Sequence, residues 1–222
     1  DLFQIVLERV KPQRNLVNRT KTRENFWIYA EPRKRMREAL RGERRFIVTC
    51  RTAKHRIFAF LPPDVMPDTK IVAIALNDAW ELAVLQSKAH LIWAARTGGW
   101  LGVGDDGSYN HSDCFAKFAF PVASDTQKAR LRALGDELDS TRKLVLAANC
   151  DLTLTGLYNL LEKVKAGAEL TPAEEDAKQR GRVLILKELH DQIDALTAQA
   201  YGWPVDLSDE QILEKLVALN AE

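Results

Sequence analysis

The sequence predicts an α+β fold: a small antiparallel or mixed sheet with covering helices in residues 1–122, followed by an all-helical region in residues 123–222. Short runs rich in β-branched and aromatic residues succeed one another between residues 44 and 76. Beyond Pro121, apolar residues recur at spacings of three and four. With 222 residues, 46% of them hydrophobic, the chain can bury one substantial core or two modest ones.

The predicted sheet is built from three strands that follow a short helix. Residues 31–42 favour the helix, because Pro32 suits a first turn and Gly42 suits a helix end. Met36 and Leu40 lie one turn apart within it. Three runs predict the strands: "RRFIVTCRT", "HRIFAFLP" and "KIVAIAL", at residues 44–52, 55–62 and 70–76. A small antiparallel sheet with one covering helix is the arrangement that these runs favour.

Residues 77–96 predict a single helix. Apolar residues recur there at helical spacing, and Asn77 or Asp78 is placed to cap the first turn. The apolar positions are Leu82, Leu85, Ala89, Ile92 and Trp93. We interpret Gly98 and Gly99 as the C-terminal stop of this helix.

The glycines that follow resemble a phosphate-binding pattern. Gly102, Gly104 and Gly107 spell GxGxxG, as in dinucleotide-binding loops. Such a loop needs a buried strand before it and a helix after it, whereas here a predicted helix precedes it and a polar run follows. Asp105 and Asp106 would also repel a phosphate. The segment is therefore interpreted as an irregular loop, and a nucleotide-dependent enzyme built on it is disfavoured.

The helical region is marked by three capping boxes, in which a Ser or Thr precedes a Gln or Glu by three positions. They are Ser124 with Gln127, Thr171 with Glu174, and Ser208 with Gln211. Apolar stripes at residues 131–138, 157–164, 186–200 and 213–217 predict four helices, and Gly167 and Gly202 end the second and third of them. A net-acidic bundle of this kind is more often a scaffold than a catalytic element.

The composition excludes several classes of protein. No run of eighteen apolar residues occurs, which excludes a membrane span. Cys50, Cys114 and Cys150 are odd in number and far apart, so neither a disulfide framework nor a zinc site is indicated. The histidines are equally scattered and offer no metal site. Because the chain starts with Asp and has no signal-type leader, we expect a cytoplasmic protein and a piece of a longer polypeptide.

The net charge of +1 conceals a strong asymmetry. Residues 1–56 hold 16 Lys and Arg against 6 Asp and Glu, whereas residues 57–122 sum to −3 and residues 123–222 to −6. A basic N-terminal quarter on an acidic chain is expected of a surface that binds a polyanion. The alternative is a solvated helix face whose arginines pair with acids elsewhere in the fold.

The stretch "VKPQRNLVNRTKTRENFW" has residue types suited to DNA contact. Lysine and arginine neutralise phosphates, asparagine can pair with adenine edges, and an interleaved Trp27 can stack or wedge. A surface segment with one buried Trp is the alternative. No nucleophile with a plausible base stands out, so the residue chemistry favours a binding module over an enzyme.

Four segments in order resemble the C-terminal third of the MmeI-like class of large SAM-dependent DNA methyltransferases, some of which are fused to a nuclease as restriction–modification enzymes. They are "VKPQRNLVNRTKTRENFWIYAEPRKRMREAL", "IALNDAWELAVLQSKAHLIWAARTGGWLGVGDDGSYNHSDCFAKFAFP", "LTLTGLYNLLEKV" and "ELHDQIDALTAQAYGWPVDLSDEQILEKLVALNAE". The resemblance covers essentially the whole chain. It implies that residues 1–122 form a target recognition domain and residues 123–222 the helical C-terminal region.

The resemblance also implies where the chemistry lies. In that class, an upstream domain binds SAM and carries an Asn-Pro-Pro-aromatic motif for the flipped adenine, and this sequence has no Asn-Pro-Pro. We therefore expect no cofactor in this fragment and SAM in the parent enzyme. The expected partners are double-stranded DNA and the upstream methyltransferase domain of the same polypeptide. The expected function is sequence-specific DNA recognition for a site-specific adenine methyltransferase; the alternative is a helical protein-interaction scaffold.

In the family, the segment matching Ser108–Ser112 belongs to a loop of Arg-Tyr-Asn type that reads bases from the major groove. Ser108 stands where arginine is common, and Ala119 departs from the usual Phe-Pro-Phe-Pro. The candidate base contacts are Tyr109, Asn110, His111 and Lys117. The candidate phosphate contacts are Arg14, Arg19, Lys21, Arg23, Arg33, Arg35, Lys54 and Arg56. We expect both groups to share one concave surface shaped for the double helix.

Overall fold

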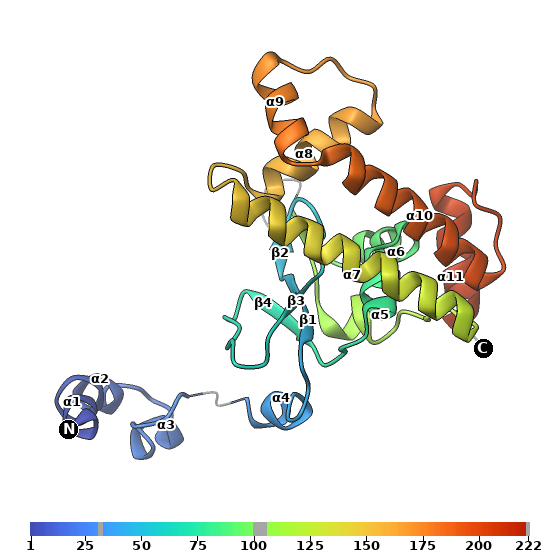
Figure 1. Ribbon diagram of the computed structural model, residues 1–222. Helices are drawn as coiled ribbons and strands as arrows, with labels where there is room; N and C mark the ends of the chain where they lie inside the picture. Colours follow the sequence, from blue (N-terminus) through green and yellow to red (C-terminus); the bar gives the residue numbers. More distant parts are fainter. Residues whose placement is uncertain (31–32, 100–105, 221–222) are drawn as a thin grey trace. The chain divides into compact units, whose positions relative to one another are not determined.

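The computed structural model describes residues 1–30, 33–99 and 106–220. The chain divides into two compact units, Asp1–Arg41 and Gly42–Glu222 (Figure 1). The boundary predicted at 122/123 lies inside the second unit, and the division into residues 1–122 and 123–222 stays a prediction.

The first unit is a set of short helices. They are α1 (Leu2–Ile5), the π-helical turn η1 (Val6–Val10), α2 (Lys11–Asn15), α3 (Thr20–Glu24) and α4 (Lys34–Ala39). Within its described residues only Thr22, Phe26 and Leu40 are buried. Helix α4 confirms the predicted helix in a shorter form, while Pro32 lies outside the described residues.

The second unit begins with the predicted antiparallel sheet. Strands β1 (Phe46–Cys50), β3 (Ala59–Leu61) and β4 (Ile71–Ile74) are ordered β3-β1-β4, and both pairings are antiparallel. In this register Ile47 of β1 lies between Phe60 and Ile74. The α+β class and the three strands are confirmed. A further two-stranded pairing joins β2 (Thr52–Ala53) to β5 (Gly107–Ser108).

The single helix predicted for residues 77–96 is wrong: the structure has two helices, α5 (Ala79–Gln86) and α6 (Lys88–Thr97). Asp78 caps α5, since its side chain accepts from the N–H of Trp80 at 3.2 Å. Ser87 is extended and its hydroxyl donates to the carbonyl of Val84 at 2.7 Å. Because the helix is interrupted at Ser87, the N–H of Lys88 has no partner within the helix, and it donates to the side chain of Asp194 at 2.6 Å. A carboxylate from the far end of the chain therefore stabilises the break.

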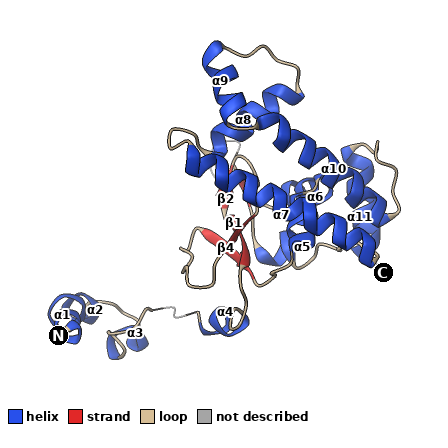
Figure 2. Ribbon diagram, in the orientation of Figure 1, coloured by secondary structure: helices blue, strands red, loops and turns tan. Residues whose placement is uncertain are grey.

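In the helical region, a helix begins at each of the three starts that the capping boxes predicted. Its helices are α7 (Asp125–Ala148), α8 (Leu154–Lys165), α9 (Pro172–Arg180), α10 (Val183–Tyr201) and α11 (Asp209–Asn220), drawn in blue in Figure 2. The capping boxes at Ser124 and Thr171 are both complete. Ser208 and Gln211 likewise exchange two hydrogen bonds at the start of α11.

Helix α7 closes the exposed edge of the sheet. An edge strand leaves backbone groups unpaired, and such groups need partners when they are covered. The N–H of Phe60 donates to Asp139 at 3.1 Å, and its carbonyl accepts from Lys143 at 2.8 Å. The carbonyl of Phe58 accepts from Arg142 at 2.9 Å. Side chains of α7 thus complete the hydrogen bonding of β3, which joins the sheet to the helical region.

Helix α7 also approaches α5 very closely. A Cβ on Gly135 would lie 2.1 Å from the carbonyl oxygen of Ala79, so only glycine allows this approach. One buried cluster, which includes Leu82 and Tyr109, joins the sheet to α5 and α6. A larger one, which includes Leu138 and Ile193, fills the helical region.

None of the helices in the described ranges is long and apolar enough to cross a membrane. Within the same ranges, no three or more His, Cys, Asp or Glu side chains gather as a metal site would require.

Candidate nucleic-acid interface

Two segments far apart in the sequence meet at β2 and β5. Ser108 pairs with Thr52, and Gly107 pairs with Ala53. The N–H of Tyr109 donates to the carbonyl of Arg51 at 2.7 Å. The predicted base-reading loop therefore runs directly alongside residues 51–56, which carry two of the predicted phosphate contacts.

Tyr109 is a core residue, which corrects its assignment as a base contact. Its side chain is 0% exposed, and its hydroxyl lies 3.0 Å from Nε2 of His90. Its ring packs edge-on against Phe58, with centroids 5.5 Å apart. Burial raises the pKa of the Tyr109 hydroxyl and lowers the pKa of His90 to about 3, so both groups are neutral at pH 7. Tyr109 therefore anchors the loop from within the core.

Arg56 supports the loop, which corrects its assignment as a phosphate contact. Its guanidinium donates to the carbonyls of Cys50 and Gly107, the latter at 2.7 Å, and lies 5.1 Å from the Tyr109 ring centroid. Burial lowers its pKa from the usual value. Because these bonds use its donors on backbone oxygens, the guanidinium acts as a clamp between β1 and β5.

Asn110 begins the exposed part of the loop. Its side-chain oxygen accepts from the N–H of Asp113 at 2.7 Å and so caps the π-helical turn η2 (His111–Phe115). The buried Cys114 fixes the inner side of this turn. His111 and Ser112 are exposed on its outer side. Asn110 is half-buried, and the cap uses its side-chain oxygen and not its amide donors.

Lys117 closes the loop as an exposed cation. Its ammonium lies 2.7 Å from Asp113, and this hydrogen bond holds the pKa of the Asp113 carboxyl below its usual range. Both side chains are well exposed, so the pair is weak and readily exchanged. Lys117 stays available to an anionic partner.

Gly98 explains part of the glycine cluster. A Cβ at this position would lie 2.1 Å from the carbonyl oxygen of Ser108, so glycine lets the loop cross the end of α6. The adjacent N–H of Ser108 donates to Gly99 at 2.7 Å. Gly98 is also the C-cap of α6, as predicted. Gly102, Gly104 and Asp105 lie outside the described residues.

Lys54 faces the helical region. Its ammonium donates to the side-chain oxygen of Asn159 at 2.7 Å and lies 3.4 Å from Glu162. The same oxygen of Asn159 lies 2.8 Å from Nε2 of His55. Lys54 is exposed, and both of these contacts are with side chains of α8. It therefore helps to hold the sheet to the helical region, and its phosphate contact stays a prediction.

The other candidate cations belong to the first unit. Arg23 donates to the carbonyl of Val17 at 3.1 Å and to the hydroxyl of Thr20 at 3.2 Å, so it braces the turn before α3. Arg33 adopts a left-handed backbone with φ of 49°. The remaining candidates are the half-buried Arg14 and the exposed Arg19, Lys21 and Arg35. That these cations share a surface with the loop stays a prediction.

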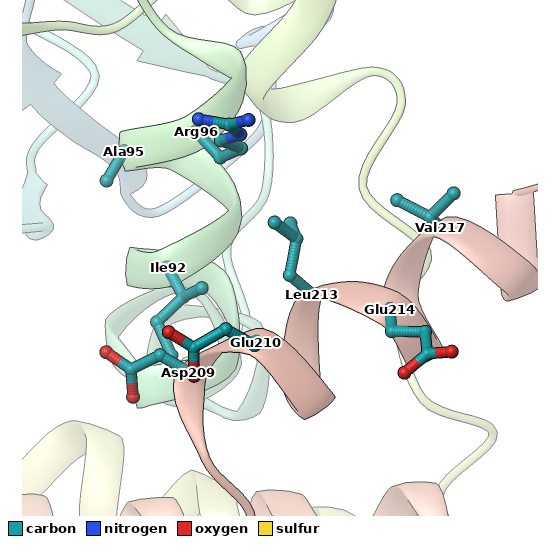
Figure 3. A pocket seen from close by; sticks show the side chains of 8 residues that line it. All are labelled: Ile92, Ala95, Arg96, Asp209, Glu210, Leu213, Glu214 and Val217. Carbon is teal, nitrogen blue, oxygen red and sulfur yellow. The ribbon is translucent and has the colours of Figure 1, made fainter.

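An open groove of about 650 Å³ lies between α6 and α11 (Figure 3). Apolar side chains line it, and three carboxylates stand on the α11 side. The lining residues are Ile92, Ala95, Arg96, Asp209, Glu210, Leu213, Glu214 and Val217. Sequence reasoning did not single out this groove, because its walls come from helices more than a hundred residues apart.

The support beneath the loop was also missed. His90 lies within the helical pattern of α6 and carries no local signal of its contact with Tyr109. Arg56 was selected for its charge alone. The roles of His90 and Arg56 beneath the loop depend on the pairing of β2 with β5, two segments that are far apart in the sequence.

Comparison with solved structures shows that this fold occurs within a restriction–modification enzyme. The enzyme is type IIL MmeI, whose structure is a complex with DNA, and the match has a TM-score of 0.69 at 14% sequence identity. The match covers 99% of this chain and 26% of the MmeI chain, so this chain spans about a quarter of that enzyme. Neither a protein-family model nor a curated protein matches the sequence. The TM-score shows a shared fold, and at this identity the likeness shows the fold alone.

Proposed function

We propose that this chain is a sequence-specific recognition module for double-stranded DNA within a restriction–modification type of adenine methyltransferase. The observation that carries the proposal is the loop at residues 107–117. Its inner residues are fixed by Tyr109 and Arg56, and its outer residues present donors, acceptors and one cation. A rigid polar loop of this kind is what base readout in the major groove requires.

Within the loop, base contact falls to the residues that remain accessible. Asn110 offers amide donors, His111 offers ring nitrogens, and Lys117 offers an ammonium group. Such groups suit adenine and guanine edges, which expose N6, N7 and O6 in the major groove. The fold shared with a DNA-bound enzyme supports this use of the loop.

Phosphate contact is assigned to the first unit. Residues 1–41 carry 11 Lys and Arg against 5 Asp and Glu. Such a segment supplies affinity that depends on salt and not on base sequence. Base readout by the loop and phosphate contact by the first unit would then be separable by mutation.

Catalysis and SAM binding are assigned to another part of the parent polypeptide. The first unit supports the existence of a folded neighbour, because Leu2, Phe3, Ile5 and Leu16 are each at least half exposed. Large apolar side chains in such numbers usually pack against another surface. We propose that this surface belongs to the methyltransferase domain.

The test separates base readout from phosphate contact. An Asn110→Asp variant keeps the oxygen that caps η2 and removes the amide donors, whereas Lys21→Ala removes an exposed cation. Selection from a random duplex library at two salt concentrations should show lost preference at one base pair for the first variant. The second should bind all sequences more weakly, with a salt slope smaller by about one.

Two results would contradict the proposal. One is a wild-type chain without duplex affinity at low salt. The other is an Asn110→Asp variant that selects the same sequences as the wild type. Thermal unfolding of both variants controls for loss of fold.

The groove between α6 and α11 favours a second function, protein docking. Its apolar lining and carboxylate rim suit a cationic amphipathic helix. A partner protein that stays bound after nuclease treatment, and that no longer binds the Val217→Glu variant, would support this function. Val217 is 55% exposed, so its side chain is accessible to such a partner.

A further inference from the structure

The turn after α3 exposes three large apolar residues in succession. Trp27, Ile28 and Tyr29 are 51%, 42% and 76% exposed. A run of this kind on a surface is unfavourable in water and usually marks a binding site. We call these three consecutive residues, which follow α3 in a turn, the tip.

The tip is backed by a small aromatic cluster. The ring of Trp27 packs edge-on against Phe26, with centroids 5.2 Å apart and an interplanar angle of 90°. Phe26 is 8% exposed, and its ring centroid lies 6.2 Å from that of Phe3. The ammonium of Lys11 lies 5.1 Å from the Phe26 ring centroid. Trp27 thus packs against a buried ring while about half of its surface stays exposed.

The tip is also joined tightly to α3. The N–H of Ile28 donates to the carbonyl of Asn25 at 3.2 Å. Both the backbone N–H and the side-chain amide of Asn25 donate to the carbonyl of Lys21, at 3.2 and 3.1 Å. These bonds join the tip to the last turn of α3, which carries Lys21 and Arg23.

Aromatic tips flanked by cations suit one ligand above others. Phosphates lie beside every base step, so a surface that presents cations around an apolar side chain can hold the backbone and enter the stack. A protein surface would cover the tip without needing this positive charge. We therefore propose that Trp27, with Ile28 and Tyr29 beside it, is a wedge that inserts between base pairs of duplex DNA. This inference rests on the proposed DNA-binding function.

The test uses the full chain and a duplex that carries 2-aminopurine at several adenine positions, whose fluorescence rises when neighbouring bases unstack. The wild type should raise the fluorescence at saturation. Trp27→Ala should abolish the rise and weaken binding by roughly 5- to 150-fold, the range for loss of one base–aromatic contact. Trp27→Phe, which keeps a ring, should restore most of the signal.

Lys21→Ala is the matched control. It should weaken binding but reach the wild-type fluorescence once saturated, because it removes phosphate contact and leaves the wedge. Unchanged fluorescence and affinity in Trp27→Ala would overturn the wedge and leave the DNA-binding function standing. Absence of duplex binding by the wild type would overturn both. Circular dichroism of each variant confirms that the fold is intact.

Discussion

The second unit contains two buried His–Tyr pairs of the same construction in different surroundings. Nε2 of His90 lies 3.0 Å from the Tyr109 hydroxyl, beneath the candidate loop. Nε2 of His190 lies 2.8 Å from the Tyr158 hydroxyl, between α8 and α10. Burial is the largest cause in both cases, and it lowers the pKa of each histidine to about 3. Both pairs are therefore neutral, hydrogen-bonded groups of the core.

Each pair has an arginine beside it, and the arginines differ in use. Arg56 and Arg142 each lie 5.1 Å from the ring centroid of their tyrosine, Tyr109 and Tyr158 respectively. Arg142 is 2% exposed and donates to the Tyr158 hydroxyl and to the Phe58 carbonyl. Arg56 is partly exposed and donates to the carbonyls of the loop and of β1.

Phe58 connects the two groups. Its ring packs against Tyr109, while its carbonyl accepts from Arg142. The comparison teaches that the same three residue types can hold helices to a sheet or hold a surface loop in one shape. Substitutions in the group of Tyr158, His190 and Arg142 should therefore affect stability alone. Substitutions in the group of Tyr109, His90 and Arg56 should affect both stability and DNA recognition.

Acid should destabilise both groups strongly and equally. Because the folded pKa of each histidine lies below its unfolded value of about 6.5, each contributes stability that is lost as pH falls from 6.5 towards 3. The loss is about 1.4 kcal/mol per pH unit for each histidine. Urea unfolding at several pH values between 4 and 6 gives the slope of the free energy of unfolding against pH. This slope should be smaller by this amount in His90→Gln and in His190→Gln than in the wild type.

The slopes are compared between variant and wild type, because Glu81 and Asp194 have raised pKa values and act in the opposite direction. An unchanged slope in either variant would show that its histidine is already protonated, or solvent-exposed, in the folded protein. Unequal slopes would break the equivalence of the two groups.

Tyr158→Phe should lower the free energy of unfolding by about 2–3 kcal/mol. The substitution keeps the ring but leaves a buried guanidinium donor of Arg142 and Nε2 of His190 without their partner. Chemical denaturation at pH 7 measures the loss. DNA sequence preference should stay that of the wild type, and a changed preference would contradict the division of roles.

Local signals explain which elements the sequence predicted. The start of α7 depends on Ser124 and Gln127, and the start of α9 on Thr171 and Glu174, so each signal lies within four consecutive residues. The break at Ser87 could not be predicted, because the carboxylate of Asp194 that stabilises it lies 106 residues beyond Lys88.

The same limit applies to the candidate site. His111 and Lys117 are exposed polar residues, as their chemistry indicated. The burial of Tyr109 depends on His90 in a preceding helix, and the use of Arg56 depends on a carbonyl 51 residues away. Residue type predicted the polar loop but not which of its members faces inward.

Asp194 provides a test of opposite sign. Burial raises the pKa of this carboxyl to about 6, so the folded protein loses stability as pH rises from 3.8 to about 6. Asp194→Asn keeps an oxygen for the N–H of Lys88 and removes the buried charge. It should raise the free energy of unfolding at pH 7 by about 1–2 kcal/mol and leave it nearly unchanged at pH 4. A variant less stable at pH 7 would show that the negative charge itself is needed at the start of α6.

Tyr109→Phe should have the smallest effect on stability and the most informative effect on function. It removes one hydroxyl and leaves Nε2 of His90 unpaired, which should lower the free energy of unfolding by about 1 kcal/mol. The ring still packs against Phe58, so the core stays filled. The loop, however, loses its hydrogen bond to α6, and donors displaced by a fraction of an ångström discriminate bases poorly. Duplex selection should therefore show a flattened sequence preference with unchanged non-specific affinity, whereas Tyr158→Phe should keep both the preference and the affinity of the wild type. If both variants keep the wild-type preference, the buried hydroxyl under the loop has no role in recognition and the two His–Tyr pairs are equivalent.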